Sequence, residues 1–135
     1  GGLQSVQLGL NDRVRYEVTG LTPGVVYTLD FDAWVVSETY TSWSNGIRCQ
    51  VFDKEAYWWP PIVTIQTGAG VTGGWVHKSG TFTCPASGSI HMELGGKGDH
   101  TAFDGYLDKI TLVPEPATMT LLCLGAAGLL ARRRR

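Results

Sequence analysis

The stretch Tyr27-Thr-Leu-Asp-Phe-Asp-Ala-Trp-Val35 decides the fold, because apolar and polar residues alternate along it from end to end. Successive side chains of a β-strand point to opposite faces of a sheet. The spacing therefore places Leu29 and Phe31 on one face and Asp30 and Asp32 on the other. A strand with one apolar and one polar face is typical of an antiparallel sheet that covers a core on one side only.

The same alternation recurs along the chain in short runs that are separated by turn residues, such as Pro23-Gly24 and Asn45-Gly46. The alternating runs are residues 6–10, 14–18, 27–35, 47–51, 62–65, 82–84, 90–94 and 106–112. No window of twelve residues before residue 113 follows the period of an amphipathic helix. The pattern predicts an all-β fold, an antiparallel β-sandwich of seven or eight short strands.

The chain ends in a tail of three parts, which we assign to residues 113–135, after a sandwich domain of residues 1–112. The tail begins with Pro114-Glu115-Pro116 and continues as an uncharged run from residue 117 to residue 131. It closes with four arginines, Arg132, Arg133, Arg134 and Arg135. The uncharged run predicts one C-terminal hydrophobic helix of about 22 Å, shorter than the hydrocarbon core of a bilayer at about 30 Å. The positive-inside rule would keep the arginines on the cytoplasmic side of the membrane.

This tail resembles the PEP-CTERM sorting signal of surface proteins in Gram-negative bacteria that make an extracellular matrix. The resemblance implies that an exosortase, a transpeptidase-like enzyme of the inner membrane, recognises Pro114-Glu115-Pro116. The protein would then be exported, held in the inner membrane as an intermediate, and delivered to the cell surface or extracellular matrix. Two alternatives remain, an ordinary C-terminal anchor and a buried helix of a soluble domain.

Three segments of the body resemble the galactose-binding-like jelly roll of secreted carbohydrate-binding modules. They are residues 16–33, Gly80-Thr-Phe-Thr-Cys-Pro85 and Gly105-Tyr-Leu-Asp-Lys-Ile-Thr-Leu112. The resemblance implies a non-catalytic domain that binds an extracellular polysaccharide. It also implies that Asp108 helps to hold a structural calcium ion, since hard cations take oxygen ligands. By alternation Asp108 shares a face with Ile110 and Leu112, so we expect its carboxylate to point inward. The alternative is an inward carboxylate with backbone or arginine partners.

Aromatic side chains mark the candidate sugar-binding residues, because the apolar face of a pyranose packs on a flat ring. The first set, in two expected loops, is Trp43, Tyr57, Trp58 and Trp59. These rings could instead cap one end of the sandwich. Trp34 is in step with Asp30 and Asp32, so we expect it on the outer face, either under a loop or in a binding platform with Arg48 and Gln50.

The two cysteines of the body, Cys49 and Cys84, could form a disulfide in an oxidising compartment or be two small buried apolar residues. The chain begins Gly-Gly-Leu, so we expect an export signal upstream and an N-terminally truncated domain.

The charge of the body argues against a nucleic-acid partner. The tail holds four of the 11 basic residues and Glu115, so residues 1–114 carry seven Lys and Arg against 11 Asp and Glu. This mildly acidic body has no basic stripe.

Nothing in the sequence indicates catalysis. His77, His91 and His100 are widely spaced, and no nucleophile elbow, phosphate loop or Cys-x-x-Cys motif is present. The sequence therefore predicts an exported, non-catalytic, carbohydrate-binding protein. The alternatives are a purely structural matrix protein without a ligand and a fragment of a secreted hydrolase.

Overall fold

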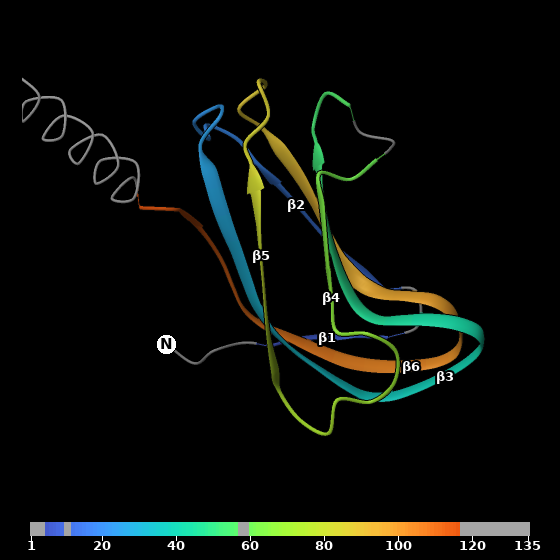
Figure 1. Cartoon of the computed structure of the whole chain (residues 1–135). Coiled ribbons are helices and arrows are strands. Elements are labelled where there is room, and N and C mark those ends of the chain that lie inside the picture. The colour runs from blue at the N-terminus through green and yellow to red at the C-terminus, as the bar shows by residue number, and fades with distance from the viewer. Residues whose placement is uncertain (1–4, 10–11, 57–59, 117–135) are drawn as a thin grey trace, which may run out of the picture.

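The computed structural model describes residues 5–9, 12–56 and 60–116, with the backbone alone for residues 40–45 and 97–101. The described residues form an all-β, antiparallel sandwich of two layers (Figure 1) and contain no helix. The strands are β1 (Val6–Leu8), β2 (Arg13–Val18), β3 (Val26–Asp53), β4 (Val63–Gln66), β5 (Val76–Thr83) and β6 (Ile90–Pro114).

Two long strands, β3 with 28 residues and β6 with 25, organise the whole fold. They pair with each other from Tyr27 opposite Pro114 to Asp53 opposite Ile90. The sequence predicted two separate short strands within the span of β3 and two within the span of β6. This prediction is wrong, because each span is one continuous strand. The β3–β6 ribbon bends (Figure 1), and register shifts between Thr39 and Ile47 accompany the bend.

Because this ribbon doubles back on itself, its two halves lie in different layers. In what we call the first sheet, residues 26–39 of β3 and 102–114 of β6 lie between β5 and β1. In the second sheet, residues 47–53 of β3 and 90–96 of β6 lie between β4 and β2.

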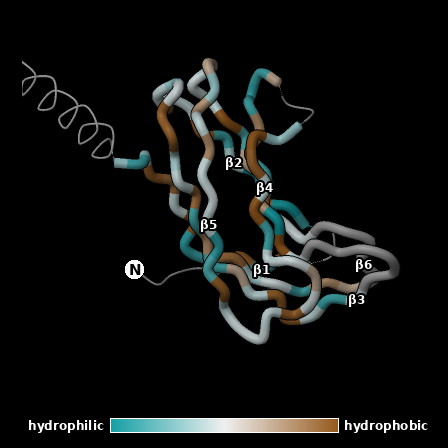
Figure 2. Tube along the Cα trace, viewed as in Figure 1, coloured by the Kyte–Doolittle hydropathy of each residue, from teal (hydrophilic) through white to brown (hydrophobic). Residues whose placement is uncertain are grey.

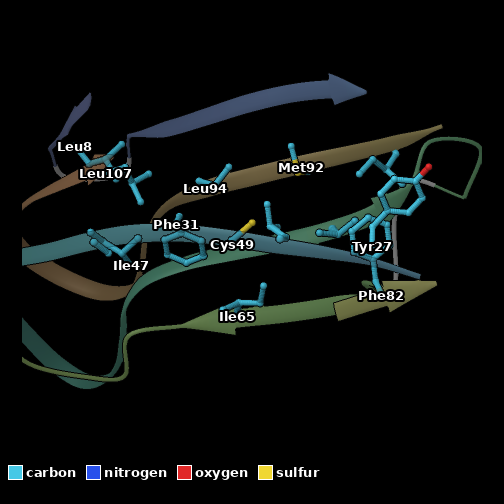
Figure 3. Packing of buried hydrophobic residues seen from close by; sticks show 14 of the residues in the cluster. Leu8, Tyr27, Phe31, Ile47, Cys49, Ile65, Phe82, Met92, Leu94 and Leu107 are labelled. Atoms are coloured by element: carbon cyan, nitrogen blue, oxygen red, sulfur yellow. The ribbon is translucent and has the colours of Figure 1, made fainter. Parts of the chain in front are cut away.

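The core lies between the two sheets, where their apolar faces meet (Figure 3). Figure 2 shows the alternation of hydrophobic and hydrophilic residues along the strands that produces these faces. Leu29, Phe31, Ala33 and Val35 of β3 are fully buried, which confirms the alternation predicted for residues 27–35. The second sheet contributes further buried side chains, among them Ile47, Cys49, Val51, Ile65, Ile90, Met92 and Leu94.

The last strand extends further than the sequence predicted. We expected the sandwich to end at Leu112, but Val113 pairs with Thr28 and Pro114 pairs with Tyr27. The expected hydrophobic helix and the four terminal arginines lie outside the described residues. Among residues 5–9, 12–56 and 60–116 there is no helix with the length and apolar character needed to cross a membrane.

Candidate functional site

Three aromatic rings form a row across the outer face of the first sheet. Trp34 of β3 lies between the inward-facing Ala33 and Val35, so its own side chain points outward. The ring of Tyr106, its cross-strand partner in β6, has its centroid 6.1 Å from that of Trp34, with 42° between the planes. On the other side Trp75, which precedes β5, has its centroid 6.0 Å from Trp34 at 59°. Trp75 is 46% exposed, so the row is open to solvent at that end.

A row of charged groups lies next to the aromatic row on the same face. Asp32 of β3 is paired with His77 of β5 on one side and with Asp108 of β6 on the other. Asp32 Oδ1 is 3.0 Å from His77 Nδ1, and Asp32 Oδ2 accepts a hydrogen bond of 2.9 Å from Lys109 Nζ.

These contacts keep two of the charges fixed over a wide pH range. Hydrogen bonds from Lys109 and then His77 lower the pKa of the Asp32 carboxyl. The bond to Asp32 raises the pKa of the Lys109 ammonium. Asp32 therefore stays an acceptor, and Lys109 stays a donor, throughout the neutral range.

Asp108 faces outward, so the predicted inward carboxylate is wrong. Between the pairs Asp32–Asp108 and Asp30–Thr111, β3 has one residue where β6 has two, Lys109 and Ile110. This extra residue is a β-bulge, which shifts the alternation by one position. Asp108 and Lys109 consequently lie on the outer face, although Ile110 still packs against the core.

The described surroundings of Asp108 add no support to the calcium site that the resemblance implied, which stays a prediction. Asp108 Oδ1 accepts a hydrogen bond of 2.7 Å from the backbone N–H of Lys109. The positive charge near Asp32 and Asp108 is the Lys109 ammonium, which would repel a metal ion. Within the described part of the chain, no three His, Cys, Asp or Glu side chains are grouped so that they could hold a metal.

The sugar-binding rings predicted from the sequence are not those of the aromatic row on the first sheet. Tyr57, Trp58 and Trp59 lie outside the described residues, and Trp43 lies in β3 at a position described for its backbone alone. Trp34 was predicted to lie on the outer face, which is confirmed. Trp75 and Tyr106 were missed, because only the register of β5 and β6 against β3 brings them beside Trp34.

Cys49 and Cys84, for which the sequence left a disulfide open, do not form one in the structure. Cys49 and Cys84 are both free and buried, so the alternative of two small buried apolar residues applies. Burial raises the pKa of the Cys49 thiol to about 12 and also raises that of Cys84. Both thiols are therefore neutral at physiological pH.

The first residues of the tail are attached to the first sheet. The backbone N–H of Glu115 donates a hydrogen bond of 2.9 Å to the carbonyl oxygen of Val26. Thr28 Oγ1 donates one of 3.3 Å to Glu115 Oε1. Because Pro114 is the last residue of β6, the predicted Pro114-Glu115-Pro116 motif begins inside the folded body.

Comparison with known proteins identifies the tail. Residues 112–135 match the PEP-CTERM protein-sorting motif, which indicates an exported protein that an exosortase-type enzyme handles at the membrane. No curated protein sequence matches the chain.

Several solved structures resemble the body. A structure of CBM4 has a TM-score of 0.56 and 21% identity. The match covers 76% of this chain but only 61% of the CBM4 chain. The C-terminal domain of EclA, a sugar-binding protein, has a TM-score of 0.56 and 14% identity, with 84% of this chain and 79% of that one covered. The second family 16 carbohydrate-binding module has a TM-score of 0.52 and 20% identity, with 84% and 78% covered. Likeness at these identities establishes the fold of the body.

Proposed function

We propose that this protein is a non-catalytic, carbohydrate-binding sandwich that an exosortase-type enzyme delivers to the cell surface or extracellular matrix. The observation that carries the proposal is the row of Trp75, Trp34 and Tyr106 beside the charged row of Asp32 and His77. The likeness of the fold to carbohydrate-binding modules supports it. The sorting motif supports delivery to the outside of the cell.

The two rows together have the chemistry that sugar recognition needs. A pyranose has an apolar face of C–H groups, which packs on aromatic rings, and a rim of hydroxyl groups, which need hydrogen-bonding partners. The exposed ring of Trp75 offers the first contact. Asp32 accepts hydrogen bonds and Lys109 donates them. A sugar hydroxyl could therefore donate to Asp32 or accept from Lys109.

Titration of the full chain with polysaccharides, followed by tryptophan fluorescence, tests the proposal. We expect a shift of the emission in the wild-type protein, with dissociation constants in the micromolar to millimolar range, about −8 to −4 kcal/mol. Trp75→Ala should weaken binding about tenfold, which corresponds to about 1.4 kcal/mol. Its thermal melt should change little, because the ring is half exposed.

A double variant, Trp58→Ala with Trp59→Ala, tests the loop that the sequence favoured. If this pair abolishes binding and Trp75→Ala does not, the site is the loop and not the face of the first sheet. If the wild-type protein binds no polysaccharide, the proposal fails, and a purely structural matrix protein becomes the better account.

A further inference from the structure

All three arginines of the body gather on the outer face of the second sheet, on the opposite side of the sandwich from the aromatic row. The register places Arg13, Gly95 and Arg48 side by side on β2, β6 and β3. The next row on the same face contains Arg15, Glu93 and Gln50. The body as a whole is acidic, so this group of three arginines stands out within it.

Among the described residues, Glu93 is the carboxylate that forms ion pairs with these arginines. Glu93 is bound by two of the arginines, with Oε2 at 3.4 Å from Arg13 Nη1 and Oε1 at 3.1 Å from Arg15 Nε. Among the described residues, Arg48 has no carboxylate oxygen within 4.0 Å. Its Nη2 donates instead to the neutral Oε1 of Gln50 at 2.9 Å.

Arg48 is also partly removed from water. Desolvation and then the positive charge of Arg13 lower the pKa of the Arg48 guanidinium, and the negative charge of Glu93 offsets part of this effect. A partly buried cation near a second cation is unfavourable unless an anion compensates for it. Gln50, which orients Arg48, is itself buried and bonds at 3.5 Å to Thr64 of β4. Arg48 is therefore held in place by neutral partners.

Arg13 and Arg48 both line a small open hollow on this face. It has a volume of about 10 Å³ and is lined by Arg13, Arg48, Gln50, Glu93 and Gly95, among others. Gly95 leaves no side chain there, and a Cβ at this position would lie 2.3 Å from the carbonyl oxygen of Asp12. The volume suits one water-sized group, such as a single oxygen of an anion.

We propose that this hollow binds the carboxylate of a uronic-acid sugar, so that the glycan partner of this protein is an acidic polysaccharide. The proposal rests on the proposed carbohydrate-binding function and names the class of glycan. Arginine suits a carboxylate ligand, because the planar guanidinium group can donate two parallel N–H hydrogen bonds to a carboxylate. Arg48 would then gain a carboxylate in direct contact, in addition to the charge of Glu93, which acts on it from beyond ion-pair distance.

Calorimetric titration of the full chain with an unbranched galacturonate hexamer tests this proposal. The control ligand is the same hexamer with every carboxylate converted to its methyl ester. We expect the acid to bind at least tenfold more tightly than the ester at 20 mM salt, and we expect the difference to shrink at 200 mM salt. Arg48→Gln should remove most of this difference and leave binding of the ester unchanged.

Two further variants make the result specific. Arg13→Gln alters a more exposed side chain on the same hollow, and it stands in for Arg48→Gln if that variant does not fold. Lys54→Gln makes the same change of charge at an exposed residue paired with Glu17, and it should leave the preference for the acid intact. Equal binding of acid and ester, or an equal loss in Arg48→Gln and Lys54→Gln, would overturn the proposal.

The outcomes separate this inference from the function on which it rests. If Trp75→Ala weakens binding of both hexamers and Arg48→Gln weakens neither, carbohydrate binding stands and the acidic class is wrong. If Arg48→Gln alone weakens binding of the acid, the arginine hollow stands and the aromatic row is not the site. If neither hexamer binds, both proposals fail for this class of sugar.

Discussion

Lys109 has a φ of 50°, in the left-handed region that residues with a Cβ rarely adopt, and no other non-glycine residue of the described chain has a positive φ. This conformation accompanies the bulge in β6, which turns Asp108 and Lys109 outward. The composition of the charged row therefore depends on the backbone at a single position.

Lys109→Gly should be more stable than Lys109→Ala by about 1 kcal/mol. Both variants lose the ammonium group that binds Asp32, so their difference reports the backbone alone. Glycine adopts a positive φ without the steric cost that a Cβ brings. Urea unfolding of the two variants measures the difference. Equal midpoints would show that the left-handed conformation of Lys109 is not a source of strain.

This bulge also explains why the sequence predicted one residue of this face correctly and another wrongly. Alternation places Trp34 on the outer face, because β3 is regular from Tyr27 to Val35. The same argument fails for Asp108, since alternation counts residues and cannot detect an inserted one. A glycine or asparagine in place of Lys109 would have indicated a left-handed residue, but a lysine does not.

At the scale of the elements, the positions of the apolar runs were predictable and their connections were not. The runs 27–35 and 47–51 both lie in β3, and 90–94 and 106–112 both lie in β6. Glycine pairs such as Gly95-Gly96 occur both in tight turns and in bends of a continuous strand. A single sequence cannot separate these cases, because the bend depends on pairing with a distant partner.

Gly80 marks a close approach of two edge strands. A Cβ on Gly80 of β5 would lie 2.6 Å from Cγ1 of Ile65 in β4. Gly80→Ala should therefore destabilise the sandwich by about 1–3 kcal/mol through overpacking. Denaturant unfolding checks the size of the effect.

A double variant shows whether this contact is the cause. Ile65→Ala removes the two nearest atoms, so Gly80→Ala should cost much less in that background. Strictly additive effects of the two substitutions would mean that Gly80→Ala acts by another route.

At the scale of the whole molecule, the sorting motif and the sandwich share residues. Replacing Pro114, Glu115 and Pro116 by alanine should prevent processing by an exosortase-type enzyme and leave the protein in the inner membrane. The sandwich should stay folded, because the bond from residue 115 to Val26 uses the backbone. Fractionation and the size of the product measure the processing.

The matched control is Thr28→Val, which removes the hydroxyl that bonds Glu115 and keeps the motif. It should be processed like the wild-type protein. Normal processing of the triple alanine variant would show that these three residues are not read as a sorting signal.

The continuity of β6 with the tail also has a mechanical consequence. A force applied to the tail acts on the body at Pro114, the last residue of β6. β6 is hydrogen-bonded to β3 along its length and to β1 and β2 on its other edge. Inter-strand hydrogen bonds run perpendicular to antiparallel strands, so tension along β6 loads many of them at once in shear. Tension applied through the tail would therefore be shared between both layers of the sandwich, because β6 is a central strand of each.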